Sequence, residues 1–377
     1  MNLILLLLAA AGISLLQSWV YRRYWDVKLD AAVFFPPAPA VEGESTQLTE
    51  VITNQKFLPL PALHVKFQFH RNLQFQNQEN TAVTDQCYRS DIFSVLPFQR
   101  ITRTLTVSCP HRGYYTIRQL DLIAHNLLMT DALVWVFPVN TWLYVYPRPI
   151  DDALLEVPFQ KIMGTVINRR YVYPDPFSFR GIREYQTSDP MNTVNWKATA
   201  HTGELMVNTH DSTVSQQVVL LLNLEEGGLF QANQLHEESI RLAAALSLRL
   251  LNASVPVRVV CNGLDTVTRQ VIHVPAGNGA RQAEEINECL ARIDLELDTP
   301  VYAPFLEEEL YSHERKEHLY ILIGASQHTS TVALAESLAQ KTGTLLWILP
   351  FYPDTPPGVS STDQIELLQW EVTRHAS

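Results

Sequence analysis

The chain has few cysteines, and none of them stands at metal-binding spacing from another. Cys87, Cys109, Cys261 and Cys289 are scattered over 377 residues without a Cys-x-x-Cys motif. Zinc ribbons need closely spaced ligand pairs, and small disulfide-bonded folds need a denser set of cysteines. The sequence therefore argues against both classes and predicts a few buried free thiols.

An excess of positive charge is also absent. The 28 lysines and arginines are outnumbered by 39 aspartates and glutamates, which gives a net charge of −11. Binding of nucleic acid needs a basic face to neutralise phosphates, so we expect no nucleic-acid partner. Anionic lipid would repel the same acidic body, so any contact with a membrane should come from a dedicated segment.

Common hydrolase motifs are missing as well. Gly-x-Ser-x-Gly and His-Glu-x-x-His do not occur, so serine hydrolases and zincins have no support. Lys341-Thr342-Gly343 matches a triplet of penicillin-binding enzymes, but the required Ser-x-x-Lys is absent upstream. Gly277-Asn278-Gly279 lacks the third glycine of a dinucleotide-binding turn. We therefore expect no enzymatic activity, no catalytic residue and no organic cofactor.

A long apolar run opens the chain and predicts a membrane anchor over residues 1–25. Residues 3–16 are almost uninterrupted apolar, and the next residues extend the run to about the 20 needed to cross a bilayer. Aromatic and basic residues follow, as at a membrane interface: Trp19, Tyr21, Arg22, Arg23, Tyr24, Trp25 and Lys28. By the positive-inside rule, the body would lie on the cytoplasmic side of the cell membrane.

A cleaved secretory signal is the alternative for this segment, and it would make the body an exported protein. Such a signal needs a basic start and a small-residue cleavage site. Met1 and Asn2 supply no positive charge, and no Ala-x-Ala motif follows the apolar run. The anchor is the favoured interpretation.

The body divides by pattern into five further segments. Residues 26–40 contain Pro36-Pro37-Ala38-Pro39 and predict a stiff spacer. Residues 41–149 alternate in short runs rich in β-formers, which predicts a small β-sandwich. Residues 150–215 form a connector with a helix near 154–163, and residues 351–377 form an irregular tail with a short amphipathic helix at 363–372.

Residues 216–350 alternate between strands and helices. Strands are expected at 218–222, 257–260, 271–274, 319–323 and 344–349, and helices at 235–251, 280–293 and 330–341. This alternation predicts a doubly wound, mostly parallel sheet. Ligands of such sheets bind beyond the carboxyl ends of the strands, here the loops after Leu222, Val274 and Ile323.

The connector carries a run of polar and aromatic residues that resembles the signature of the domain of unknown function 58 family. The residues that carry the resemblance, or stand at its positions, are Arg183, Tyr185, Asp189, Asn195, Trp196, Lys197, Ala200, Gly203, Glu204 and Leu205. The chain departs from the family pattern at Ser188, Asn192 and Asn195, where the family has Gly, Arg and Asp. The resemblance implies a membrane-anchored protein with a von Willebrand factor A-like domain and a MoxR-type AAA ATPase as partner. It implies no settled activity.

Two roles are open for the signature residues themselves. Arg183 and Asp189 are spaced for an ion pair across a loop, while Trp196 offers an apolar anchor that the stem of Lys197 could cover. The segment could be a clasp that fastens the chain to the sheet edge, or a docking face for a protein partner. The two roles are compatible.

A metal site is the remaining candidate. Magnesium-binding von Willebrand factor A domains use Asp-x-Ser-x-Ser after the first strand, whereas this chain has Asn223, Glu225 and Gly227 at the corresponding positions. The position is degenerate, so we expect no metal. The alternative is a metal-dependent adhesion module or hydrolase that uses Glu225 and Glu226. The favoured function is a membrane-anchored, non-enzymatic scaffold that binds other proteins.

Overall fold

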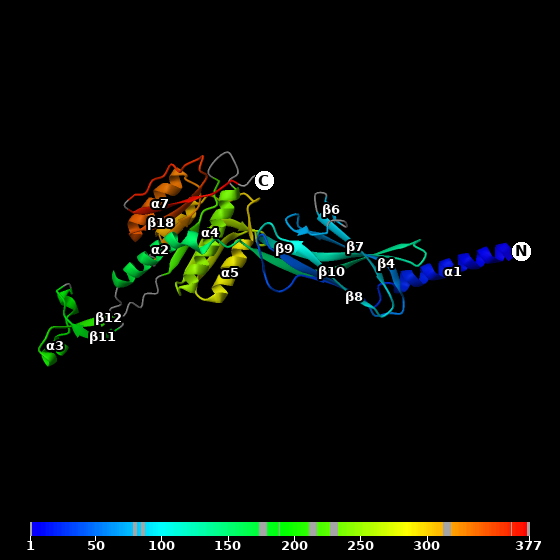
Figure 1. Ribbon diagram of the computed structural model, residues 1–377, viewed down its shortest axis with the longest axis horizontal. Helices are drawn as coiled ribbons and strands as arrows, with labels where there is room; N and C mark the ends of the chain where they lie inside the picture. The colour runs from blue at the N-terminus through cyan, green and yellow to red at the C-terminus, as the bar shows by residue number, and fades with distance from the viewer. Residues whose placement is uncertain are drawn as a thin grey trace. The chain divides into compact units, whose positions relative to one another are not determined.

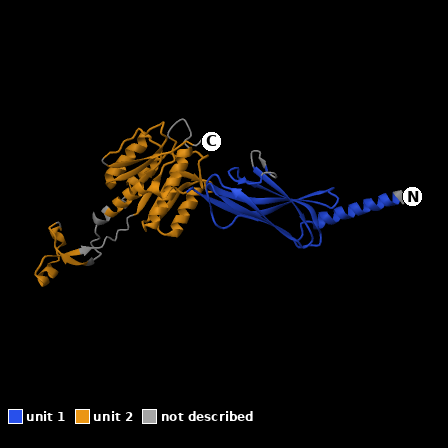
Figure 2. Cartoon of the chain, viewed as in Figure 1, with its two compact units in different colours: residues 1–148 blue, residues 149–377 orange. Residues whose placement is uncertain are grey.

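The computed structural model describes most of the chain, in nine stretches: residues 2–77, 81–83, 87–172, 179–187, 189–210, 217–226, 233–311, 318–362 and 364–374. It divides into two compact units, residues 1–148 and 149–377 (Figure 2). The architecture is mixed α/β, with an apolar helix at the start of the chain and several separate sheets.

The predicted apolar helix is present as α1 (Asn2–Tyr24), at the blue end of the chain in Figure 1. Its stretch Ile4–Tyr24 has a mean hydropathy of 1.9 and is long enough to cross a membrane. Most of its large apolar side chains are exposed, whereas Tyr21 and the following Trp25 are buried in the first unit. Only the last turns of the helix therefore pack on protein.

Two sheets follow α1 in the first unit, and most of their strand pairs are antiparallel. The four-stranded sheet has the order β1-β3-β8-β5 and contains β1 (Leu29–Phe34), β3 (Ser45–Asn54), β8 (Arg100–Ser108) and β5 (Gln74–Phe75). The six-stranded sheet has the order β2-β10-β9-β4-β7-β6 and contains β2 (Ala40–Val41), β10 (Ala132–Tyr146), β9 (Gly113–His125), β4 (Leu60–Phe69), β7 (Cys87–Val95) and β6 (Thr81–Val83). Both sheets contribute to one hydrophobic core, as in a β-sandwich.

The spacer expected at 26–40 is wrong for part of its length. Residues Leu29–Phe34 form β1, which pairs antiparallel with β3 along six residue pairs. Its burial alternates, with Leu29, Ala31 and Val33 facing the core. This alternation places the segment in the sandwich, because a strand with one buried face stabilises the sheet it joins.

The second unit is built on a seven-stranded sheet. Its strands are β15 (Val271–Gly277), β14 (Val257–Asp265), β13 (Val218–Leu222), β17 (Leu319–Ile323), β18 (Leu345–Phe351) and β19 (Ile365–Glu371), in this order, with β16 (Ile293–Asp294) paired to β14. The run from β14 to β19 is parallel, and β15 is antiparallel. All five residues of β13 are buried, as expected of a strand covered on both faces.

Helices cover both faces of this sheet. One core joins the sheet to α2 (Asp152–Val172), α4 (Asn233–Asn252) and α5 (Ala280–Ala291). The other joins it to α6 (Ala303–Tyr311) and α7 (Thr329–Thr342). Successive residues of β13 alternate between the two cores, so this strand is the centre of the unit.

Two expectations for this unit are wrong. The amphipathic helix expected at 363–372 is strand β19, which pairs in parallel with β18 and buries Ile365. The loop after Val274 does not lie at the carboxyl edge of the central strands. Because β15 runs antiparallel, its Gly277 pairs with Val257, at the opposite edge.

Candidate functional site

The signature residues form a small subdomain with its own two-stranded sheet. Strand β11 (Phe179–Glu184) pairs antiparallel with β12 (Met206–His210), and the residues between them include the short helix η1 (Met191–Thr193) and α3 (Trp196–Thr202). Val194 and Val207 are buried and bridge to each other. The predicted connector is therefore a folded element, and its strands do not join the seven-stranded sheet.

The predicted pairing of Arg183 with Asp189 is present and shapes this subdomain. Nη1 and Nη2 of Arg183 lie 2.7 and 2.6 Å from the two oxygens of Asp189, a two-point contact. Asp189 also accepts a hydrogen bond of 2.8 Å from the amide of Gln186. The hydrogen bonds from Arg183 and Gln186 lower the pKa of Asp189, so the carboxylate stays charged. The pair thus holds the turn that follows β11.

Asn195 begins α3 as its N-cap. Its Oδ1 accepts a hydrogen bond of 3.0 Å from the amide of Ala198, and its Nδ2 donates to Asn208 Oδ1 at 2.7 Å. Asparagine and aspartate both cap helices well, so the departure from the family residue keeps the cap.

The remaining signature side chains lie toward solvent. Trp196 is 63% exposed, Lys197 and Glu204 are exposed, and Tyr185 is half-buried, with its amide bonded to the carbonyl of Leu205 at 2.8 Å. Trp196 therefore does not act as a buried anchor of a clasp in this subdomain. Ile182, Met191 and Leu205 are exposed too.

A second polar group lies at the carboxyl edge of the seven-stranded sheet, between β13 and β17. Strand β14, which follows β13 in the sequence, lies on one side of β13, and β17 lies on the other side. The carboxyl edge of the sheet at β13 is therefore a topological switch point. The amide of Asn223 donates to the carbonyl of Ile323 at 2.8 Å. A Cβ on Gly324 would lie 2.4 Å from the carbonyl oxygen of Asn223, so only glycine fits there.

Asn223 and Glu225 are tied into the protein at this edge. Asn223 is buried, and its Oδ1 accepts a hydrogen bond of 2.9 Å from the amide of Glu225. Glu225 Oε2 accepts from the amide of Tyr302 at 3.3 Å. Glu226 is exposed, and its carbonyl lies 2.8 Å from Nε2 of His328. Gly227 lies outside the described residues.

This arrangement does not suit a divalent cation. The one side-chain oxygen of Asn223 is already engaged, and the described part of the chain holds no group of three or more His, Cys, Asp or Glu placed to bind a metal. Hard cations need several oxygen ligands, at least one of them anionic.

His236, at the start of α4, favours its neutral form. Burial lowers the pKa of its imidazole, and this effect is larger than the opposite effect of the nearby Glu226 carboxylate, which raises the pKa.

Sequence reasoning did not single out two buried polar side chains that follow β17. Ser326 lies in the loop after β17 and Thr331 in the first turn of α7. Ser326 Oγ, Thr331 Oγ1 and Asn223 Nδ2 are buried and have no hydrogen-bond partner among the described residues. The only signal for Ser326 was its place after a buried strand.

A family model described as "Protein of unknown function DUF58" matches residues 181–324 of this chain. The match begins in β11 and ends at Gly324, so it includes both the signature subdomain and the switch-point edge. Over these residues the chain is similar to this family.

No curated protein matches the chain. Solved structures match about a third of it with low scores. Domains D2 and D3 of the major pilin SpaD from Corynebacterium diphtheriae are 10% identical, with 30% of this chain and 52% of that chain covered and a TM-score of 0.24. A Salmonella alpha-2-macroglobulin mutant is 18% identical, with 30% and 7% covered and a TM-score of 0.22. A cohesin from Archaeoglobus fulgidus is 10% identical, with 31% and 91% covered and a TM-score of 0.22. Scores this low support no inference about function.

Proposed function

We propose that this protein is a membrane-anchored, non-enzymatic scaffold that docks a protein partner on the signature subdomain. The partner would be a MoxR-type AAA ATPase, acting with this protein in the assembly or maturation of other proteins. The seven-stranded unit would be the von Willebrand factor A-like domain that the family resemblance implies. The anchor would be α1, with the body on the cytoplasmic side.

The exposure of Trp196 is the observation that supports a docking role. A tryptophan at 63% exposure contributes little to the stability of the subdomain that carries it. The turn beside it is held by the Arg183–Asp189 pair and the Asn195 cap, so the ring is presented on an ordered element. Exposed aromatic side chains on ordered elements dominate the binding energy of many protein interfaces.

A pull-down of the full chain from detergent-solubilised membranes tests this proposal. Trp142 on β10 is also exposed, at 49%, so Trp142→Ala is a matched control for Trp196→Ala. We expect wild type and Trp142→Ala to recover the ATPase, and Trp196→Ala to lose most of it. Equal recovery by all three proteins would refute docking through Trp196.

Two further measurements test the anchor and its sidedness. Carbonate extraction should leave the protein in the membrane pellet, and release into the supernatant would refute the anchor. Protease added to spheroplasts should digest the body only after lysis if it lies on the cytoplasmic side.

A titration with Mg²⁺ tests the alternative function. The scaffold should show no Mg²⁺ binding in the micromolar range, whereas an adhesion module or hydrolase based on Glu225 and Glu226 would bind Mg²⁺.

A further inference from the structure

The end of the β-sandwich from which α1 leaves is formed by three loops. The strand registers place the end of β3, the starts of β4 and β8, and the ends of β7 and β9 at this same end. The loops are residues 55–59, 96–99 and 126–131. Asn54 Nδ2 donates to the carbonyls of Leu58 and Leu96 at 2.9 and 3.0 Å, which ties the first two loops together.

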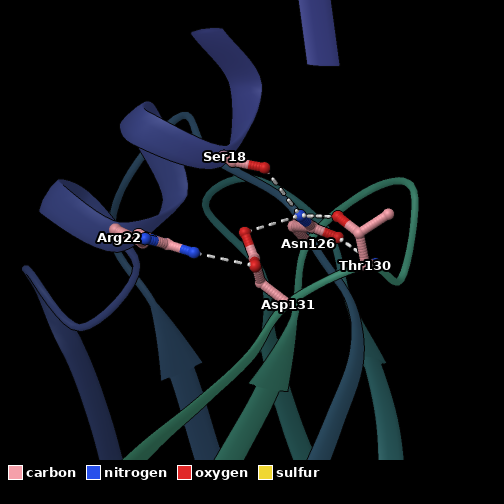
Figure 3. Close-up of polar contacts among 5 residues, drawn as sticks. All are labelled: Ser18, Arg22, Asn126, Thr130 and Asp131. Carbon is pink, nitrogen blue, oxygen red and sulfur yellow. Dashed lines mark hydrogen bonds and ion pairs between the residues drawn. The ribbon is translucent and has the colours of Figure 1, made fainter. Parts of the chain in front are cut away.

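The first and third of these loops contact the last turns of α1. Tyr21 donates its hydroxyl proton to the carbonyl of Pro59 at 2.7 Å. Figure 3 shows the contact with the third loop, where Asn126 Nδ2 lies 3.3 Å from Ser18 Oγ and Arg22 Nη2 lies 3.0 Å from Asp131 Oδ1. The hydrogen bonds from Arg22 and Ser18 lower the pKa of Asp131 and keep it charged. These contacts fix the level at which the helix leaves the sandwich.

The tips of the three loops are apolar and exposed. Exposed fractions range from 56% to 83% for Phe57, Leu96, Phe98, Leu127, Leu128 and Met129. Single exposed apolar residues are ordinary, but six on three loops around one apolar helix form a ring of like chemistry.

Two of these side chains sit on a backbone that disfavours them. Phe98 has a φ of 56° and Met129 a φ of 52°. This left-handed region favours glycine and asparagine, and a bulky residue there is strained. Strain of this kind persists where a function uses the side chain. A large apolar group at each tip is therefore a feature to explain.

The exposed apolar surface of α1 reaches the level of these loops. Leu15, Leu16 and Trp19 are exposed, at 73%, 63% and 59%. They lie beside Ser18, which contacts Asn126 of the third loop. Lipid that covers this part of α1 therefore also meets the end of the sandwich.

We propose that the three loop tips insert into the lipid interface around α1, so that the sandwich end is seated in the bilayer surface. The occupant of the ring is lipid, because the helix that these loops contact is the membrane span, and this inference rests on that proposed anchor. The six apolar side chains extend the apolar surface of the helix, while Arg22 and Asp131 neutralise each other at the same level.

Depth-dependent quenching on the full chain in phosphatidylcholine nanodiscs tests the inference. Cys87, Cys109 and Cys261 are buried, so Cys289→Ser gives a background for labelling introduced cysteines. A fluorophore is placed at Phe57→Cys or Leu128→Cys, and Trp19→Cys reports insertion of the helix. Ser45→Cys is the control, because Ser45 is exposed at the far end of β3, about 30 Å away along ten residues.

With a spin-labelled lipid as quencher, we expect loss of emission at positions 57, 128 and 19 and unchanged emission at 45. The double variant Phe98→Gly, Met129→Gly relieves the left-handed strain, so it should fold, yet it should reduce quenching at position 57. Quenching at 19 without quenching at 57 and 128 overturns the inference and leaves the anchor intact. Loss of quenching at 19 as well refutes the anchor itself. Energy transfer between labelled copies at position 57, without quenching by lipid, assigns the ring to a second copy and also overturns the inference.

Discussion

Replacement of Glu50 by glutamine should remove a large part of the pH dependence of the first unit's stability. Glu50 on β3 is 1% exposed and stands opposite Arg103 on β8. From the other sheet, β7 contributes Arg89 and Asp91, whose side chains pair at 2.5 Å, and Arg103 reaches Asp91 at 3.0 Å. Burial, and then the charge of Asp91, raise the pKa of Glu50 to about 8.

The sign follows from the protons bound in each state. Between pH 4.5 and about 8 the folded protein holds a proton on Glu50 that the unfolded chain releases. The contribution of Glu50 to the unfolding free energy therefore has its full value below pH 4.5, and it falls as pH rises to about 8. At about 1.4 kcal/mol per pH unit, the loss is on the order of 5 kcal/mol. Glutamine stays neutral and can still donate to Asp91, so Glu50→Gln should match wild type near pH 4.5 and exceed it at pH 8.

Urea unfolding read by pulsed thiol labelling separates the two units. Cys87 and Cys109 are buried in the first unit and Cys261 in the second. Glu50→Gln should move the urea midpoint for the first two thiols at pH 8, with little change for Cys261. Glu44→Gln, at an exposed carboxylate of the same unit, should leave all midpoints nearly unchanged. A difference between wild type and Glu50→Gln that is the same at pH 5 and pH 8 would refute the reasoning.

Three other predictions concern charges. Lys56 is 9% exposed, its Nζ has no hydrogen-bond partner among the described residues, and burial lowers its pKa to about 8. Lys56→Met should raise the unfolding free energy by about 2 kcal/mol at pH 7 in urea titrations. This gain should shrink between pH 8 and 10.5, because the folded wild type has by then lost the proton on Lys56. Glu309→Gln should lower the unfolding free energy of the second unit by about 3 kcal/mol in the same assay, because it removes the negative charge that neutralises the buried Arg258, 2.8 Å from Glu309. The contribution of Asp189 to the stability of the β11–β12 pair should be complete above pH 3.8 and lost as pH falls through its lower folded-state pKa. Amide hydrogen exchange in this pair should therefore stay slow down to pH 3.8 in wild type. In Asp189→Asn it should already be faster at neutral pH.

Long periodic segments of the second unit could be read from the sequence alone. β17 was predicted at its observed bounds, and α4 and α7 within two residues of theirs, because a buried strand or an amphipathic helix leaves a clear apolar period. Strand β19 was mistaken for a helix. The spacing of Ile365, Leu368 and Val372 suits a helical face, and only pairing with β18 decides the matter.

The direction of β15 was available from chain length. Only residues 266–270 separate it from β14, which is enough for a hairpin and too short for a parallel crossover. For the candidate site, opposite charges six residues apart gave the Arg183–Asp189 pair. The close approach of Gly324 to Asn223 could not be found in this way, because it depends on β17 lying next to β13.

Energetic cost in the first unit is concentrated at the end that surrounds α1. Among its described residues, the non-glycine positions with positive φ are Lys28, Phe98 and Met129, all at this end, and each costs about 1–2 kcal/mol relative to a relaxed backbone. Lys56, whose Nζ has no hydrogen-bond partner within the described part of the chain, lies in a loop of the same end. An end that served only to connect strands would gain stability from glycine or asparagine at the strained positions and from a neutral residue at position 56. The same mutations should therefore affect stability and membrane insertion differently. Glycine at positions 98 and 129 should keep or raise the stability of the first unit, and it should weaken insertion of the loop tips into lipid.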